Sequence, residues 1–429
     1  MTRHSNAVEA NTRRRLAVAI TAALILPTSG AMAAEVTPLA EGQQVADGTA
    51  LILDKDAYAT TQDNEQVLLA KNGGTITVYL PATLTSSGAG ASVAHAIGDN
   101  STVSLIGSVV QTEGDAAFGL DARDGGKIEA SGSMITTAGA GAHGLNASGE
   151  STNGSGAVVV LTNSNVLTMG EGAAALNVED GAHVSSAVGG LITVAKDAHG
   201  VRVDGAGSSA SIHRVDIATK GEQAHGVYLR QGASAAVVDI KGDGANPATI
   251  ATEGAHARAV DVDGTGNQLT LSSAAIGTLG EAAHGLRVGG SDNTLTARDL
   301  SIVTQGADAP AVSNQGGEVS LEDTTAQTSG SGSHGLYAGE PTTAGSRPTT
   351  TATRTSIKTT GDAAMGAVAD RGGRINVSTS ELIVSGQDAA GFVVRNADSE
   401  GHLTDSTVRA EGAGGAGLLV QDAGRMTGS

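Results

Sequence analysis

The 429-residue sequence has no cysteine, no tryptophan, only seven prolines and 1% aromatic residues. Without cysteine, no disulfide can lock the fold. With so few aromatic side chains, the chain has little material for the apolar, aromatic-lined pockets typical of small-molecule and sugar sites. Strong helix formers are also scarce, whereas 62 glycines stand among many Val, Ile, Thr, Ser and Ala residues. This composition favours short strands separated by tight turns.

Basic residues are in the minority: 25 Lys and Arg stand against 44 Asp and Glu, and the formal net charge is −19. An acidic chain is repelled by phosphate backbones and by anionic lipid head groups. Nucleic acid and lipid surfaces are therefore not expected partners. Two interpretations of the acidic surface stay open, a partner of opposite charge or a surface that only keeps the protein in solution.

Long apolar runs are absent except for one near the N-terminus. Arg13, Arg14 and Arg15 form a basic n-region, residues 16–26 form an apolar h-region, and Ala31-Met32-Ala33 is a small-x-small cleavage motif. The h-region is too short to span a membrane comfortably. We therefore predict a signal peptide over residues 1–33 with cleavage after Ala33, and cleavage after Ala34 as the second choice. Its removal takes away four arginines and one glutamate and leaves a net charge of −22.

A short signature recurs along the rest of the chain at intervals of about 25 residues. Its clearest form is Ala-His-Gly followed by Leu or Val, and it begins at Ala142, Ala198, Ala224, Ala283 and, with serine in first place, Ser333. Looser copies begin at Ala94, Ala117, Ala173, Ala257, Ala309, Ala364, Ala389 and Gly415. A fixed period of this length is typical of a solenoid, in which each repeat forms one coil of a stack.

Each repeat contains three strand-like pieces separated by glycine-rich turns. The first piece follows the signature, the second alternates apolar and polar residues, and the third places an aliphatic residue two positions before Thr or a small residue. No repeat holds the ten or more residues of 3.6-residue periodicity that a helix needs. We therefore predict an all-β fold, a parallel β-helix of about thirteen coils of about 25 residues, over residues 91–429. Residues 34–90 lack the clear repeat and are expected to form an N-terminal cap or the first irregular coils.

The aliphatic residues of the third piece are the predicted core. Because side chains alternate between the two faces of a strand, Ile217, Ile250, Ile276 and Ile302 should all point inward and stack on their counterparts in neighbouring coils.

Three repeats are longer than the others, and their extra residues fall in 148–156, 241–248 and 339–350. Insertions in a solenoid map to loops at the corners, because stacked strands cannot absorb them. These loops are either a recognition surface or excursions without a partner. The sequence ends at Ser429 inside the second strand of the last coil, so we expect an open terminal coil that exposes strand edges.

Histidine is the most suggestive residue of the signature. A ladder of histidines on successive coils could bind a transition metal. However, apolar or small residues that cannot act as ligands occupy the same position in other copies. We therefore interpret it as a half-buried corner position in which an imidazole packs and finds one hydrogen-bond partner, and we predict no metal site. The histidines concerned are His95, His143, His199, His225, His284 and His334, and the replacements are Phe118, Ala174, Pro310, Met365 and Ala390.

The acidic turn from Asp261 to Asn267 resembles a calcium loop only faintly, because the EF-hand spacing and its terminal Glu are missing. Asp or Asn before Gly is ordinary turn chemistry.

Acidic residues are spread through the turns, and no coil collects carboxylates with basic partners. The chain has enough Ser, His and Asp residues to propose many Ser-His-Asp triads, so only a shown geometry could identify a catalytic one. We predict no catalytic residue and no cofactor.

Together, the export signal, the cysteine-free body and the Gly-x-x-Ala-His-Gly-Leu repeat resemble the passenger domains of Gram-negative autotransporters, of the pertactin-like kind. The resemblance covers roughly residues 36–429. It implies a right-handed β-helix displayed at the cell surface, often in adhesion or virulence. It also implies a segment that seeds folding and then an outer-membrane β-barrel, and neither is recognised in this sequence. The nearest match to an Arg-Gly-Asp motif, at Asp370-Arg371-Gly372, does not fit.

We therefore expect a secreted or surface-displayed, adhesin-like binding protein without catalysis. The alternative is a polysaccharide-active lyase or hydrolase, because β-helices also resemble the scaffold of pectate lyases and polygalacturonases. Expected partners are a host-cell or matrix receptor or neighbouring bacterial cells, with no membrane insertion by this chain. The chain is either the product of a truncated reading frame or an isolated passenger. It is expected at the cell surface or outside the cell if a barrel is supplied, and in the periplasm otherwise.

Overall fold

The structure, a computed structural model, describes residues 40–79, 81–230, 236–340 and 347–429. The predicted signal peptide and its cleavage site at Ala33 lie outside these residues. The described residues fall into two compact units, which meet in the sequence between Gly221 and Glu222. Within the described ranges, all the regular elements are strands. Nothing in those ranges has both the helical length and the apolar character of a membrane span.

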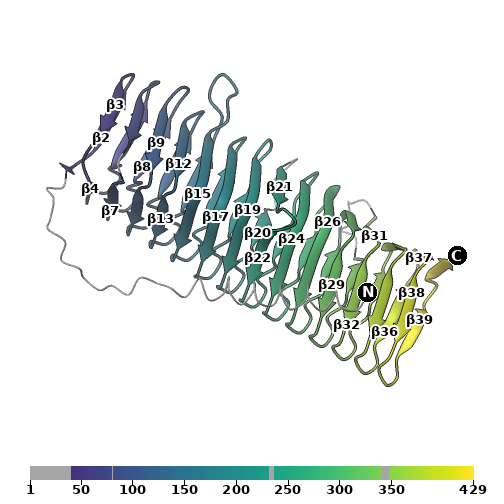
Figure 1. The fold of residues 1–429 in the computed structure, drawn as a ribbon. Helices are drawn as coiled ribbons and strands as arrows, with labels where there is room; N and C mark the ends of the chain where they lie inside the picture. The colour runs from purple at the N-terminus through teal and green to yellow at the C-terminus, as the bar shows by residue number, and fades with distance from the viewer. Residues whose placement is uncertain (1–39, 80, 231–235, 341–346) are drawn as a thin grey trace. The chain divides into compact units, whose positions relative to one another are not determined.

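Each unit is a right-handed parallel β-solenoid, as predicted, and the two hold about fourteen turns spaced about 26 residues apart. Each turn supplies one short strand to a first sheet and one or two strands to a second, broader sheet. Figure 1 shows successive strands of one unit, such as β12, β15 and β17, side by side with the same direction. The alternation of buried and exposed residues along each strand produces this arrangement, because one face of every strand must be covered.

In the N-terminal unit, the strand that follows the signature recurs seven times in the described residues. These first-sheet strands are β2 (Gln44–Asp47), β5 (Leu68–Lys71), β8 (Ala94–Ile97), β11 (Leu120–Arg123), β14 (Leu145–Ser148), β16 (Leu176–Glu179) and β18 (Val201–Val203). The second-sheet strands are β1 (Ala40–Glu41), β3 (Ala50–Leu53), β4 (Ala57–Thr60), β6 (Thr75–Val78), β7 (Thr83–Ser86), β9 (Thr102–Ile106), β10 (Val109–Thr112), β12 (Lys127–Ser131), β13 (Met134–Thr137), β15 (Val158–Thr168), β17 (His183–Thr193) and β19 (Ser209–Thr219).

The C-terminal unit repeats the same plan. Its first-sheet strands are β20 (Val227–Leu229), β23 (Val260–Val262), β25 (Leu286–Val288), β27 (Val312–Asn314), β30 (Leu336–Ala338), β33 (Ala367–Asp370), β36 (Ala390–Arg395) and β39 (Ala416–Val420). Its second-sheet strands are β21 (Val237–Lys241), β22 (Ala248–Thr252), β24 (Gln268–Thr278), β26 (Asn293–Thr304), β28 (Gly317–Glu322), β29 (Thr325–Thr328), β31 (Thr349–Thr353), β32 (Ser356–Thr359), β34 (Arg374–Ser378), β35 (Glu381–Val384), β37 (Glu400–Thr404), β38 (Thr407–Ala410) and β40 (Arg425–Gly428).

The stretch 34–90, expected as a cap or as irregular first coils, contributes turns of the solenoid in its described part. Strand β5 pairs in parallel with β2 and with β8, and β4 pairs in parallel with β7. The count of about fourteen turns therefore exceeds the thirteen copies of the signature found in the sequence. These early turns carry no recognisable signature, because residues such as Gln66-Val67-Leu68 stand in its place.

In several turns the second and third strand-like pieces form one long strand instead of two. Strands β15, β17, β19, β24 and β26 are each 11 or 12 residues long. Each bends at one residue in the left-handed region, for example Asn163 (φ 48°) and Asp299 (φ 55°). A single residue of this conformation turns the chain without breaking the ladder, and Asn and Asp adopt it more readily than most residues.

The core consists of aliphatic columns that run from turn to turn inside each unit. Ile250, Ile276 and Ile302 lie at the same level on successive turns, and all three are fully buried. Ile217 is equally buried in the N-terminal unit, where it lies level with Leu191. The predicted inward direction of the third-strand column is therefore confirmed.

The corner that leads back to the signature is closed by a buried threonine. Thr278 Oγ1 donates a hydrogen bond to the carbonyl oxygen of Ala283 at 2.6 Å, and Thr278 is fully buried. This bond satisfies a carbonyl that the tight turn leaves without a ladder partner. The same bond recurs in both units, from Thr112, Thr137, Thr168, Thr193, Thr252, Thr304, Thr328 and Thr359 to the residue five positions later.

The glycine of the signature is required by close approach rather than by its φ angle. A Cβ at Gly285 would lie 2.5 Å from the carbonyl oxygen of Ala311 in the next turn and 2.7 Å from Ile302 Cγ2. Both distances are shorter than real Cβ contacts allow. The corner of this turn is therefore packed directly against the next, and glycine fits at position 285, whereas alanine stands at the equivalent position of other turns, as Ala259 and Ala311 show.

The buried isoleucine column gives the first testable prediction. Replacement Ile276→Ala should lower the free energy of unfolding by about 2–5 kcal/mol, because it leaves a cavity between Ile250 and Ile302. Urea unfolding of the mature protein measures this change. The control Thr270→Ala, on the exposed face of the same strand, should change it by less than about 0.5 kcal/mol. An unchanged midpoint for Ile276→Ala would show that the register is wrong.

Candidate functional site

The second residue of the signature lies at a corner, one residue before the glycine that contacts the next turn. Strand pairing places these residues level with one another on successive turns within each unit. We call this set the corner column. In the N-terminal unit it includes His143, Ala174 and His199, and in the C-terminal unit it runs through His225, Arg258, His284, Pro310, His334 and Met365.

Histidine in the corner column accepts a backbone hydrogen bond from the next turn. Nδ1 of His143 accepts from the amide of Ala174 at 3.0 Å, and Nδ1 of His225 accepts from the amide of Arg258 at 3.0 Å. His334 accepts from the amide of Met365 at 3.1 Å. The imidazole thus satisfies an N–H group that the corner would otherwise leave unpaired. The predicted packing and hydrogen bond are found at these three positions, but His143 and His225 are buried rather than half-buried as predicted.

Two non-histidine residues at this corner, Met365 and Phe118, make comparable contacts. Met365 also acts as an acceptor, because the amide of Ala390 lies 3.0 Å from its Sδ atom. Phe118 stacks on His143 with ring centroids 5.3 Å apart and planes at 10°. At these two positions the corner holds either an acceptor for the amide of the next turn or a ring that packs flat against its neighbour, whereas Ala174 and Pro310 have neither a side-chain acceptor nor an aromatic ring.

His284 is the exception in the column. Its Nδ1 atom is buried and has no hydrogen-bond partner among the residues that the structure describes. The residue level with it on the next turn is Pro310, and proline has no N–H group to donate. The donor that completes the other corners is therefore missing at this turn.

The assignment of His95 to this column is wrong. Ala94 lies level with Leu120, so His95 lies level with Asp121, three positions beyond the corner. His95 Nδ1 lies 2.8 Å from Asp121 Oδ2. The sequence Ala94-His95-Ala96-Ile97 imitates the signature, but Ala94 takes the inward place of the signature leucine.

A polar ladder follows the outer side of the first sheet in the N-terminal unit. The Asp121 carboxylate is 2% exposed and also accepts hydrogen bonds from Arg123 Nε at 3.0 Å and Asn146 Nδ2 at 2.8 Å. Asn146 Oδ1 in turn accepts from Asn177 Nδ2 at 2.8 Å. Burial alone would raise the pKa of Asp121, but His95, Arg123 and Asn146 outweigh it and lower the pKa below its usual range. The carboxylate therefore stays charged and joins neighbouring turns.

A second cluster of charges occupies the same side of the first sheet in the C-terminal unit. Asp261 is 2% exposed and accepts hydrogen bonds from Arg258 Nη1 at 2.7 Å and Arg287 Nη1 at 2.8 Å. His225 Nε2 lies 3.5 Å from the same carboxylate. Burial opposes ionisation of Asp261, but the two guanidinium groups outweigh it and lower its pKa. We call Arg258, Asp261, His284 and Arg287 the arginine cluster.

Four of the corner histidines, His143, His225, His284 and His334, are neutral at physiological pH. Burial lowers the pKa of His143, His225 and His334 to about 4. Burial, together with the positive charges of Arg258 and Arg287, lowers the pKa of His284 to about 3. A neutral ring is what an Nδ1 acceptor requires, because both nitrogens of a protonated imidazole are donors.

Metal-ligand geometry is not found among the residues that the structure describes, where no three His, Asp or Glu side chains could hold an ion together. In the turn that faintly resembles a calcium loop, Asp261 faces two arginines. Asp263 Oδ1 accepts a hydrogen bond from the amide of Gly264 at 3.0 Å, which is ordinary turn chemistry.

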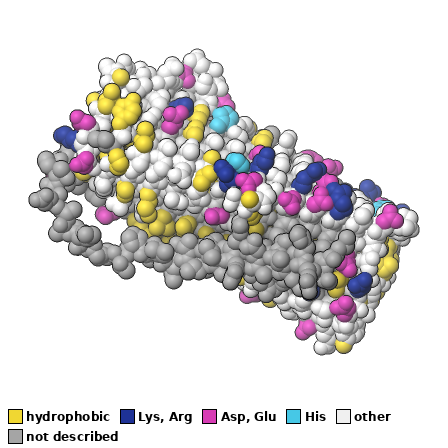
Figure 2. Space-filling view, in the orientation of Figure 1, with side chains coloured by type: hydrophobic (Ala, Val, Ile, Leu, Met, Phe, Trp, Pro, Cys, Tyr) yellow, Lys and Arg dark blue, Asp and Glu magenta, His cyan; other side chains and the backbone are white. Residues whose placement is uncertain are grey.

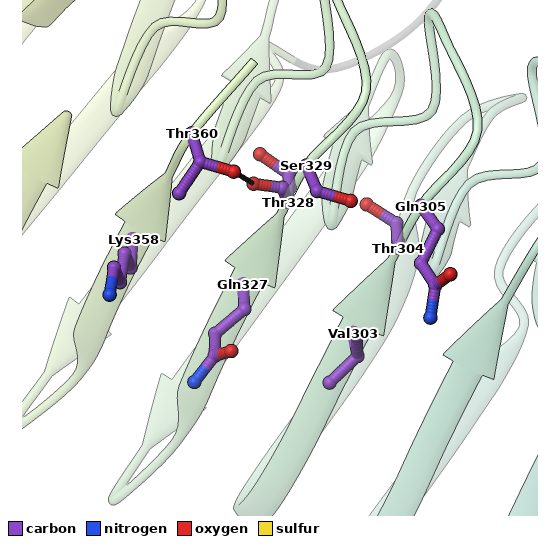
Figure 3. Close-up of a pocket in the computed structure, with 8 residues that line it drawn as sticks. All are labelled: Val303, Thr304, Gln305, Gln327, Thr328, Ser329, Lys358 and Thr360. Carbon is purple, nitrogen blue, oxygen red and sulfur yellow. Dashed lines mark hydrogen bonds between the residues drawn. The ribbon is translucent and has the colours of Figure 1, made fainter. Parts of the chain in front are cut away.

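One hollow of about 280 Å³ opens on the second sheet of the C-terminal unit. Val303, Gln327 and Lys358 lie level with one another on three successive turns and form its floor, as Figure 3 shows. Gln305, Ser329 and Thr360 line the end nearest the corner, together with Thr304 and Thr328. The hollow offers amide, hydroxyl and ammonium groups and contains no carboxylate.

The first two long repeats place their extra residues between strands, one between β14 and β15 and the other between β21 and β22. In the first loop, Asn153 Nδ2 donates to Asp99 Oδ2 at 2.6 Å, which ties the loop to an earlier turn. In the second loop, Asp243 Oδ1 accepts from the amide of Asn246 at 2.7 Å. Residues 341–346 of the third loop lie outside the described residues.

The exposed face in Figure 2 shows no patch of a single charge. Basic side chains lie beside acidic ones, and much of the face between them is backbone or uncharged polar and glycine residues, drawn white. Exposed pairs such as Arg354 with Asp323, at 2.7 Å, account for part of this pattern. Exposed ion pairs of this kind contribute little to stability.

Comparison of the chain with models of protein families, with curated proteins and with solved structures found no match.

The depressed histidine pKa values predict how stability depends on pH. Below the ordinary pKa of 6.5 an unfolded histidine takes up a proton, whereas buried His143 does not until about pH 4. Stability is therefore complete above pH 6.5 and is lost as the pH falls toward 4, by up to about 1.4 kcal/mol per pH unit for each such histidine. Urea unfolding at several pH values measures this slope.

The matched variant for that measurement is His143→Gln, whose amide oxygen can accept the same hydrogen bond without titrating. Its slope between pH 6.5 and 4 should be smaller than that of the wild type. Equal slopes for the two proteins would contradict the neutral, buried state of His143.

Proposed function

We propose that this protein is an exported passenger of the autotransporter type that acts as an adhesin-like binding protein without catalysis. The observation that carries the proposal is the β-solenoid of about fourteen turns, combined with the export signal of the sequence. A solenoid repeats one unit and displays long rows of side chains. Such a scaffold is suited to contact with an extended partner rather than to the enclosure of a small substrate.

The rows of outward side chains provide the binding surface. Successive turns lie about 4.8 Å apart, so residues at one level form a ladder with that spacing. The hollow over Val303, Gln327 and Lys358 is one segment of such a row, and its polar groups suit the hydroxyl and carbonyl groups of a glycan or an extended peptide. The corner loops, such as the one anchored by Asn153, add further contact surface.

The buried charged groups support binding and structure rather than catalysis. Asp121, Asp261 and Asp370 each accept hydrogen bonds from side chains of their own and neighbouring turns, such as Arg123, Arg287 and, for Asp370, Arg395. A catalytic carboxylate or histidine would need a hydrogen-bonding position directed toward substrate. Here the hydrogen bonds of these carboxylates go to side chains of their own turn or of a neighbouring turn.

The proposed location and partners follow from the export signal and the charge. After export, the chain reaches the cell surface or the medium if an outer-membrane barrel is supplied, and otherwise stays in the periplasm. The partner is a host-cell or matrix receptor or the surface of a neighbouring cell. A net charge of −19 works against binding to nucleic acid.

A binding assay with the purified mature chain tests the proposal. Fluorescent beads coated with the protein should attach to epithelial cells or to extracellular matrix in a saturable manner, and soluble protein should compete. Beads coated with protein unfolded in urea and then washed are the control, because the surface rows exist only in the folded solenoid. Absence of saturable attachment to cells, matrix and bacteria would contradict the adhesin-like function.

The same preparation decides between this function and the alternative, a polysaccharide-active enzyme. Incubation with a panel of acidic polysaccharides should release no reducing ends or unsaturated products. Turnover that stays with the protein through gel filtration would overturn the proposal.

A further inference from the structure

The hollow on the second sheet of the C-terminal unit gathers polar side chains that the fold does not use. Among the described residues, the side-chain amides of Gln305 and Gln327 and the hydroxyl group of Ser329 have no hydrogen-bond partner. Within the same part of the chain, the ammonium group of Lys358 has no ion-pair partner. All four side chains line one hollow that is open to solvent, so a ligand can reach them together.

The strand register brings these groups together. Val303 in β26 lies level with Gln327 in β29, which lies level with Lys358 in β32. Adjacent turns are about 4.8 Å apart, so this row is about 10 Å long. Figure 3 shows the three side chains on the same side of their strands, with Gln305 and Ser329 at the corner end of the hollow.

The neighbouring turns limit the length of the site. Before Val303, the same level holds Gly277 and Ala251, and after Lys358 it holds Ile383. None of these three residues has a side-chain hydrogen-bonding group. The volume of about 280 Å³ is at the lower end of the range for small-molecule sites. The hollow therefore suits one ring of a larger ligand that continues along the surface.

The charge of the hollow favours an anion. No carboxylate lines it. On the turn after Lys358, Glu381 lies level with Ser356, and its carboxylate is 3.6 Å from the guanidinium group of Arg409. The positive charge of Lys358 is thus left for a ligand. By contrast, the two guanidinium groups of the arginine cluster already bind Asp261.

The remaining groups favour a saccharide over a peptide. Sugar hydroxyl groups both donate and accept hydrogen bonds, as do the amides of Gln305 and Gln327 and the hydroxyl group of Ser329. The methyl groups of Val303 offer an apolar surface to the C–H face of a ring. Strands β26, β29 and β32 are paired on both sides, so no free strand edge is available to an extended peptide.

We propose that this hollow binds one carboxylate-bearing ring of an acidic saccharide. Lys358 binds the carboxylate, the amide of Gln327 and the hydroxyl group of Ser329 bind the ring hydroxyl groups, and Val303 packs against the ring. Lys358 determines specificity, because it separates an acidic ring from a neutral one. The role of the saccharide as a surface partner rests on the proposed adhesin-like function, whereas binding of the ring is measured independently.

The N-terminal unit provides a built-in control for this site. Gln111 is the third residue of β10, as Gln327 is the third residue of β29, and both precede the buried threonine of their turn. The residues level with Gln111 are Thr85 and Thr136, so no lysine stands beside it. Gln111 therefore reports on any effect of a ligand that does not depend on the hollow.

NMR of the folded mature protein, labelled with ¹⁵N in its glutamine side chains, tests the proposal. The signals are assigned with the variants Gln305→Asn, Gln327→Asn and Gln111→Asn. Sodium glucuronate, at an ionic strength held constant with sodium chloride, should shift the Gln305 and Gln327 signals in a saturable way and leave the Gln111 signals in place. Glucose should bind about tenfold more weakly, because it lacks the carboxylate that Lys358 binds.

Variants of Lys358 show whether its charge is responsible. Lys358→Gln should weaken glucuronate binding about tenfold and leave glucose binding unchanged, whereas Lys358→Arg should keep most of the affinity. Lys358 is exposed, so both variants should keep the thermal unfolding midpoint of the wild type. The control Lys127→Gln removes a lysine that pairs with Glu129 in the N-terminal unit and should change neither affinity.

The outcomes separate the site from the proposed function. Absence of saturable shifts, equal shifts at Gln111, or equal glucuronate affinity of wild type and Lys358→Gln overturns the site. Equal affinity for sodium sulfate or tetraglutamate overturns the acidic saccharide as its ligand. If glucuronate binds through Lys358 but the coated beads do not attach to cells or matrix, the site stands and the adhesin-like function fails. If the beads attach and Lys358→Gln binds glucuronate like the wild type, the reverse holds.

Discussion

Hydrogen bonding at the corner before the signature is the constraint on which the rest of this solenoid depends. Parallel ladders satisfy the backbone along the strands, but the chain must also turn in a few residues, packed against the turns on both sides. The buried threonine hydroxyl supplies the donor for one corner carbonyl, as Thr278 does for Ala283. The corner histidine supplies the acceptor for one amide of the next turn, as His143 does for Ala174. Glycine such as Gly285 lets the two turns approach closely enough for these bonds.

The same corner also shows how one residue changes the hydrogen bonding of the turn before it. Because each histidine depends on an amide from the following turn, a single proline there changes the chemistry of the preceding histidine. Pro310 leaves His284 without a donor, beside two arginines that hold Asp261. One turn of an otherwise regular repeat thus holds a buried imidazole nitrogen without a hydrogen-bond partner among the described residues.

The sequence predicted the fold well, because the features that encode it are local and periodic. The spacing of the signature gave the solenoid, and the alternation around Ile276 gave the inward face. What depends on neighbouring turns could not be predicted. Whether His284 finds a donor depends on Pro310, 26 residues away in the sequence. His95 was assigned to the wrong position because packing, and not resemblance to the signature, sets the strand register, which places Ala94 level with Leu120. The merging of strands at a bend such as Asn163 depends on the backbone and has little sequence signal.

The most direct test of this account is the free energy of unfolding of Thr278→Val, measured with urea beside Thr278→Ser. Valine occupies the equivalent level at Val384, so its shape fits the column, but it cannot bond the Ala283 carbonyl. The account predicts a loss of about 1–3 kcal/mol for valine, from a buried acceptor left unsatisfied, and a smaller loss for serine, which keeps the hydroxyl. A valine variant as stable as the wild type would contradict it.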